Sequence, residues 1–193
     1  MEHAQIDLDQ SRFASLLKAR DWAAAKVVYQ SGVHSTKSPS FRTLAGFSTG
    51  AAGKMSGEAL FMTYSGYWGV AAYADAFVTA AVDGVATATP MLDAAGAADV
   101  AREEMANKGS AYQSVWMYTI HEFEDAIGDC GRASIADNDA GVHAWDEGVA
   151  FYTGSAQTLP TPDGQSDGFL LYQLAQKRCG NFGTCGADGV AIL

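Results

Sequence analysis

The stretch SAYQSVWMYTIHEFEDAIG, from Ser110 to Gly128, decides the fold class of this chain. Large apolar residues recur along it at the spacing of a helix, from Val115 to Ile127, with polar residues between them. It contains no proline and no sustained alternation of apolar and polar residues of the kind that strands show. We therefore predict one long helix over residues 110–128.

The segments on either side have the same helical character, because alanine and other good helix formers fill them. Residues 31–53 differ: they are rich in Ser, Thr, Gly and Lys, include Pro39, and indicate a long surface loop. The sequence thus predicts an all-α fold, a bundle of about five to seven helices with a long loop in the N-terminal half, in a single domain over residues 1–193 that can be part of a longer secreted protein. The other predicted helices include two within 7–30, the first capped at Asp9 or Ser11 and the second at Asp21. The remaining ones run from Ser56 to Asp83 and over 93–107, 140–152 and 168–178.

Composition restricts the partners of the chain. Its 193 residues include 12 basic and 22 acidic ones, for a formal net charge of −10. This charge disfavours nucleic acids and anionic membranes and favours cations, although solubility alone also accounts for it. No apolar run reaches the roughly 18 to 20 residues of a membrane-spanning helix, so no membrane insertion is expected. The polar N-terminus lacks the apolar core of a secretory signal, so a secreted origin requires its earlier removal.

Two histidines occur in the same local pattern, His-x-x-acid-acid. Positions i, i+3 and i+4 of a helix share one face, so each segment presents one imidazole and two carboxylates. Such ligands suit iron, manganese or zinc, and antiparallel helices would bring the two sets together. The same acids equally fit helix capping and a solvated helix face. The candidate metal ligands are His121, Glu124, Asp125, His143, Asp146 and Glu147.

Enzymatic motifs are scarce in this chain. It has no G-x-S-x-G elbow, no phosphate-binding loop and no H-E-x-x-H motif. A di-iron oxidase would use E-x-x-H motifs with further glutamates, whereas here the order is reversed and only Glu58, Glu103 and Glu104 offer partner carboxylates. We therefore expect no enzyme, with a metal-dependent oxidase or hydrolase as the less favoured alternative.

The chain has three cysteines, Cys130, Cys179 and Cys185. Cys179 and Cys185 bracket a glycine-rich loop that can close a small disulfide ring. Cys130 could instead pair with either of them and leave one thiol free. A disulfide would indicate an oxidising compartment.

Three phrases resemble the iron-assimilation (FEA1-like) family, the low-iron-inducible and high-CO₂-inducible periplasmic proteins of algae. They are AKVVYQSG (25–32), HAWDEGVAFYTGS (143–155) and LAQKRCGNFGTC (174–185). A weaker likeness links residues 141–146 to the G-x-H-x-x-E motif of the bacterial imelysin group, with Asp146 in place of the glutamate.

The resemblance implies a periplasmic or extracellular protein without enzymatic activity. It also implies binding of iron, as Fe³⁺ or Fe²⁺, and presentation of that iron to a cell-surface uptake receptor. A secreted interaction or scaffold domain that binds no metal is the alternative from a different class.

Overall fold

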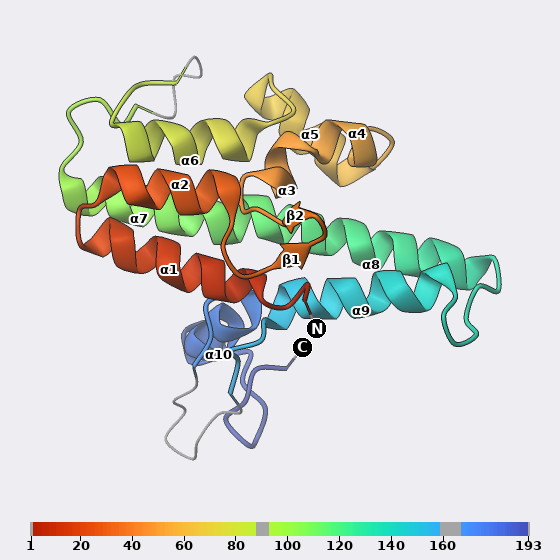
Figure 1. The fold of residues 1–193 in the computed structure, drawn as a ribbon. Coiled ribbons are helices and arrows are strands. Elements are labelled where there is room, and N and C mark those ends of the chain that lie inside the picture. Colours follow the sequence, from red (N-terminus) through yellow and green to blue (C-terminus); the bar gives the residue numbers. More distant parts are fainter. Residues whose placement is uncertain (1, 88–92, 159–166, 193) are drawn as a thin grey trace.

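The computed structural model describes residues 2–87, 93–158 and 167–192, and the predicted all-α class is confirmed (Figure 1). Within these residues the strands form one small antiparallel hairpin, β1 (Thr36–Lys37) with β2 (Ser40–Phe41). The hairpin lies in the segment predicted as a long loop, which also carries two short helices, α3 (Gly46–Thr49) and α4 (Ala51–Met55).

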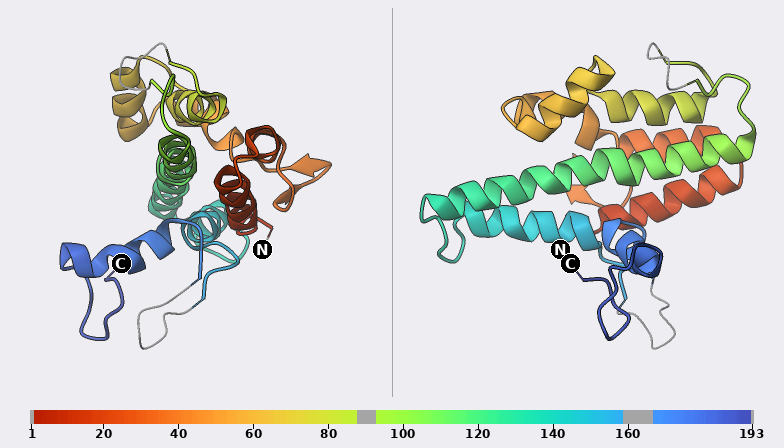
Figure 2. Two further views of the ribbon diagram at one scale, coloured as in Figure 1. Left: turned by 90° about the vertical axis from the view of Figure 1, so that its left-hand side faces the viewer. Right: turned by 180° about the vertical axis from the view of Figure 1, so that it is seen from behind.

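A continuous rod forms the centre of the fold, and it contains the stretch 110–128. It consists of α7 (Asp99–Gly109), the π-helical segment η1 (Ser110–Val115) and α8 (Trp116–Gly131), which follow one another without a gap. Figure 2 shows the rod running the length of the molecule. The stretch is therefore helical as predicted, but it continues the preceding helix and begins with a π-helical turn.

Helix α9 (Ala140–Thr153) returns along α8, and the two extend together beyond the other helices (Figure 1). Glycine permits their close approach: a Cβ atom on Gly148 would lie 2.8 Å from the ring of Phe123 on α8. The predicted end of this helix at Gly154 is confirmed, since Gly154 has a positive φ of 82°.

The N-terminal helices cover the other half of the rod. Helix α1 (Ile6–Lys18) packs on α7, α2 (Trp22–Ser31) packs on α1, and α6 (Tyr73–Asp83) packs on both α2 and α7. Asp21 caps α2 as predicted, because its side chain accepts a hydrogen bond from the backbone N–H of Ala24. The main core contains Ile6, Phe13, Leu17, Tyr29, Leu44, Val78, Val115, Phe151 and Leu170.

Two aspartates of α1 connect this helix to distant loops. The prediction that Asp9 or Ser11 caps a helix is wrong, since both residues lie inside α1 and Asp9 is fully buried. Its carboxylate accepts hydrogen bonds from the backbone N–H groups of Val33 and His34, at 3.0 and 3.1 Å. Asp7, also buried, accepts one from the N–H of Ala156 at 2.6 Å. These carboxylates fix the start of the hairpin segment and the end of α9 against α1.

The prediction of a single apolar helix from Ser56 to Asp83 is wrong, because the helix is interrupted at Gly69. Helix α5 (Ala59–Trp68) ends there with φ at 72°, and α6 begins at Tyr73. The break places α4 and α5 beside the end of α6 (Figure 1), where they form a second core with α8. This core contains Met55, Phe61, Tyr73, Ala74 and Met117.

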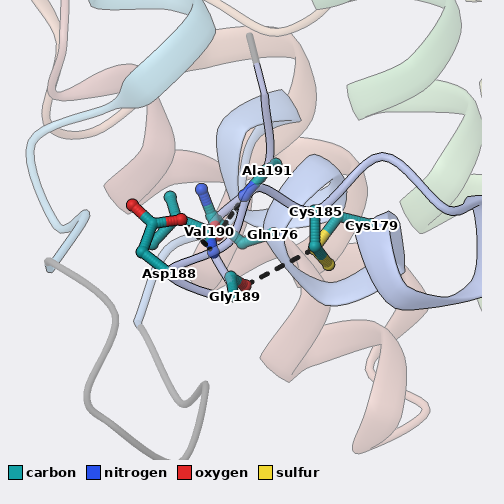
Figure 3. The surroundings of a disulfide bond; sticks show 7 residues. All are labelled: Gln176, Cys179, Cys185, Asp188, Gly189, Val190 and Ala191. Carbon is teal, nitrogen blue, oxygen red and sulfur yellow. Dashed lines mark hydrogen bonds between the residues drawn. A yellow bond between two sulfur atoms is a disulfide. The ribbon is translucent and has the colours of Figure 1, made fainter.

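The C-terminal helix α10 (Leu171–Phe182) carries the disulfide. Cys179 pairs with Cys185, so this pairing is confirmed among the alternatives, and Cys130 is an exposed free thiol. Figure 3 shows Gln176 beside the bond; its Oε1 accepts a hydrogen bond from the N–H of Ala191 at 3.1 Å. The disulfide and this contact fold the chain end back onto α10.

Candidate metal centre

A buried histidine on α8 meets a glutamate from a distant part of the chain. The Nδ1 atom of His121 lies 2.5 Å from Oε1 of Glu58, which precedes α5. The side chain of His121 is only 7% exposed. A ring nitrogen this close to a carboxylate donates a hydrogen bond to it, so Nε2 is left as the other functional atom of the ring.

Asp125 faces that second nitrogen from one helical turn further along α8. Its Oδ2 atom is 3.8 Å from Nε2 of His121, and its side chain is 60% exposed. One ligand atom each from Glu58, His121 and Asp125 lie within 4.8 Å of one another. An imidazole with two carboxylates is a ligand set that suits iron, manganese or zinc. The solvent-facing carboxylate would give an ion access to the buried ring.

Glu122, next to this cluster, is 6% exposed. Burial and, to a lesser degree, the nearby charge of Glu147 raise the pKa of its carboxyl group to about 7, while His121 and Lys54 oppose the change. Near neutral pH this carboxyl is therefore partly protonated. The low dielectric around it also strengthens the electrostatic interactions of its neighbours.

The second predicted motif lies in a different environment, on α9. His143, Asp146 and Glu147 line a cavity of about 490 Å³ together with His3 from the N-terminal segment. Oε1 of Glu147 is 3.3 Å from Nε2 of His3, so this acid has an imidazole partner that the sequence did not indicate. Burial of His3 and the charge of Arg42 lower the pKa of His3, against the opposing effect of Glu147.

The six predicted ligands are therefore distributed unevenly. The structure brings His121 and Asp125 together in the cluster with Glu58. It groups His143, Asp146 and Glu147 around the cavity beside α9. Glu124 is exposed on α8. Whether any of the six binds a metal stays a prediction.

The partner glutamates considered from the sequence have different surroundings. Glu58 reaches the cluster, whereas Glu103 is 2.5 Å from a guanidinium nitrogen of Arg20 and Glu104 is 2.5 Å from the ammonium of Lys108. Glu103 and Glu104 of α7 therefore form ion pairs away from the cluster. The local signal at Glu58 was weak: an acid after a glycine at the start of an apolar helix.

Residues 1–167 match the family model Fea1, described as low iron-inducible periplasmic protein. The chain belongs to the Fea1 family. The resemblance seen in the sequence is thereby confirmed, and so is the periplasmic location that it implied. The matched residues include Glu58, both histidine motifs and all helices before α10.

No curated protein and no solved structure matches the chain. Helix α10 and the disulfide lie beyond the residues that match the Fea1 model, so the likeness of residues 174–185 rests on the sequence phrase alone. In the part of the chain that the structure describes, no helix is both long and apolar enough to cross a membrane.

Proposed function

We propose that this Fea1 protein binds iron in the periplasm and delivers it to an uptake receptor at the cell surface, with His121 as the central ligand. The observation that carries the proposal is the position of the buried His121 ring between two carboxylates, Glu58 and Asp125. The family's description as low iron-inducible supports iron as the ion.

Glu58 and Asp125 have different roles in this proposal. Histidines that bind metals commonly donate the other ring N–H to a carboxylate, which fixes the tautomer and makes the free nitrogen a better ligand. Glu58 is placed for that role at Nδ1. Nε2 of His121 and a carboxylate oxygen of Asp125 then bind the ion, and water or a further carboxylate completes its coordination.

Charge and acidity affect this binding in predictable ways. A net charge of −10 raises the local concentration of cations around the protein. Protons compete with the metal for imidazole and carboxylate ligands, so affinity falls as the solution is acidified. The protein would therefore capture iron near neutral pH and release it in an acidified compartment.

A calorimetric titration tests the proposal. The chelator-stripped protein is titrated with Fe²⁺ under anaerobic conditions and with Fe³⁺ supplied as a weak chelate, beside the variants His121→Ala and His143→Ala. We expect His121→Ala to lose binding. His143→Ala serves as the matched control, since His143 lies in the other predicted motif on an exposed part of α9.

Other results would lead to different conclusions. Loss of binding only in His143→Ala would move the site to the α9 cavity, with His143, Asp146 and Glu147 as ligands. Absence of binding in the unmodified protein would contradict the proposal and favour a metal-free interaction domain. The contact between Glu58 and His121 would then serve only to hold α5 against α8.

A further inference from the structure

A second pocket, lined by none of the predicted metal ligands, has a positively charged lining. It has a volume of about 240 Å³ and lies between the β1–β2 hairpin, α3, α4 and α8. Three of the nine residues that line it are basic and none is acidic, in a chain with 22 acidic and 12 basic residues. The lining residues are Lys37, Phe41, Arg42, Thr43, Gly46, Phe47, Gly50, Lys54 and Tyr118.

The basic residues of this pocket have no ion-pair partner among the described residues, as is also the case for Arg12, Lys18, Lys177 and Arg178. Within the described ranges, no carboxylate lies within 4.0 Å of the side-chain nitrogens of Lys37, Arg42 or Lys54. By contrast, five other basic residues each lie next to a carboxylate. These five are Arg20, Lys26, Arg102, Lys108 and Arg132.

Arg42 is the most constrained of the three. It is half-buried, with its guanidinium carbon 5.8 Å from the centre of the Phe151 ring. One nitrogen donates a hydrogen bond to Oγ of Ser35 at 3.2 Å, and this is the only side-chain hydrogen bond that Arg42 makes to the described residues. A guanidinium has five N–H donors, and none of those of Arg42 is among the buried polar atoms that lack a partner. The remaining donors are available to a ligand in the pocket.

The acidic residues near these basic side chains do not form ion pairs with them. Burial lowers the pKa of Arg42, although the charges of Glu147 and Glu122 oppose this change. Against the effect of burial, a hydrogen bond with Tyr118 and the charges of the same two acids raise the pKa of Lys54. Neither acid lines the pocket, and both lie outside ion-pair distance of the basic groups in the described structure. They moderate the positive charge without occupying the space between the basic side chains.

We propose that the pocket of Lys37, Arg42 and Lys54 binds a small phosphate-type oxyanion, either free phosphate or the phosphate group of a small monoester. Arginine and lysine are the usual partners of phosphate oxygens, and arginine can contact two oxygens at once. The volume lies below the roughly 300 to 1,000 Å³ of sites for larger organic ligands. The rings of Phe41 and Phe47 add apolar surface to the lining.

The lysines allow a test that leaves the core intact. Lys37 and Lys54 are exposed, so a Lys37→Ala/Lys54→Ala double variant removes charge from the pocket without opening a cavity. Arg12→Ala/Lys18→Ala is the matched control: it removes the same charge from two exposed residues of α1 that lie outside the pocket.

The experiment titrates inorganic phosphate, and separately glycerol 3-phosphate, into chelator-stripped protein at low ionic strength by calorimetry. We expect binding that the pocket variant weakens by about tenfold or more, since it removes two charged groups that contact the phosphate oxygens. The control variant should bind like the unmodified protein. Binding of both compounds indicates free phosphate as a ligand, and binding of the monoester alone indicates an esterified ligand; both outcomes support the pocket.

Two outcomes would overturn the proposal. One is the absence of binding of either compound up to millimolar concentrations. The other is an equal loss of affinity in the pocket and control variants, which would show only an effect of net charge. Since the titration uses protein without metal, its result does not depend on the iron proposal.

Discussion

Nδ1 of His121 lies 2.5 Å from Oε1 of Glu58, although 63 positions separate the two residues in the sequence. The contact depends on the break at Gly69, which separates α5 from α6 and lets the start of α5 pack against α8. It gives the buried imidazole a fixed proton acceptor, so the orientation of the ring is set before any ion arrives.

Replacing Glu58 by glutamine should weaken iron binding without abolishing it. The amide keeps the size of the side chain but removes the negative charge that makes Nε2 of His121 a strong ligand. Changes of such supporting residues typically lower metal affinity by about 10- to 100-fold. Calorimetric titration of Glu58→Gln measures this effect.

Glu124→Gln is the control for this change, because it removes one exposed carboxylate of α8 that lies outside the cluster of Glu58, His121 and Asp125. A loss of affinity equal to that of Glu58→Gln would indicate a general charge effect and contradict the supporting role of Glu58. Nitrogen NMR shifts of His121 provide a second measurement: Nδ1 should be protonated in the unmodified protein.

Glu122 should make the protein less stable as pH rises. Its pKa is about 7 in the folded protein against a usual value of 4.5, so the folded state binds the proton more tightly than the unfolded state. The free energy of unfolding therefore falls as pH increases from about 4.5 to about 7 and stays low above it. Glu122→Gln should remove this fall and raise stability at pH 8 by about 2–3 kcal/mol.

Urea denaturation at pH 5 and pH 8 measures the effect of Glu122→Gln. The exposed neighbour Glu124→Gln should change stability by less than about 0.5 kcal/mol at either pH. If Glu122→Gln were as pH-dependent as the unmodified protein, burial of this carboxyl would not be the cause of the dependence.

Local patterns in the sequence predicted the helices well and the contacts between them less well. The stretch 110–128, the cap at Asp21 and the end of α9 at Gly154 depend on residues close to one another in the chain. The break at Gly69 was missed because the apolar pattern continues on both sides of this glycine. An isolated glycine within such a pattern is often tolerated inside a helix.

At the candidate metal site, too, the sequence predicted contacts within one helix but not those between helices. His121 and Asp125 are one turn apart on α8, so helix geometry predicted their shared face. The approach of Glu58 results from packing between α5 and α8, which no local pattern encodes. In the same way, Asp9 fits an N-cap by residue type, but tertiary hydrogen bonds to the loop at Val33 determine its role.

Gly148→Ala should separate the two helices that carry the histidine motifs. The added Cβ would lie 2.8 Å from the ring of Phe123, so the ring or the helix must move. Overpacking of this kind typically costs about 1–3 kcal/mol of stability. Thermal or urea denaturation measures the loss.

Gly66→Ala is the matched control for this substitution. Gly66 lies within α5, and a Cβ there would meet nothing within 4 Å. Alanine should therefore stabilise the helix, by up to about 1 kcal/mol. Destabilisation of both variants to the same extent would show that close contact between α8 and α9 is not responsible.

Asp9→Ala should release the hairpin segment from α1. The buried carboxylate accepts backbone hydrogen bonds from Val33 and His34, and its removal leaves these donors without a partner. We expect the free energy of unfolding to fall by about 3 kcal/mol, since a hydrogen bond to a charged group contributes about 1.5–3 kcal/mol. Phosphate binding should weaken as well, because the hairpin segment carries Lys37 and Arg42. Iron binding at His121 should be unaffected, because no residue of that site belongs to the hairpin.

Asp21→Ala is the control for Asp9→Ala, because it also removes a carboxylate close to α1. Asp21 is exposed and accepts one hydrogen bond, from Ala24, so its replacement should cost about 1 kcal/mol and leave phosphate binding unchanged. Hydrogen exchange locates the change in Asp9→Ala: the amides of Val33 and His34 should lose protection, while those of α8 keep it. Uniform loss of protection across α8 would instead mean that Asp9 stabilises the whole fold, and that the hairpin segment does not depend on this carboxylate in particular.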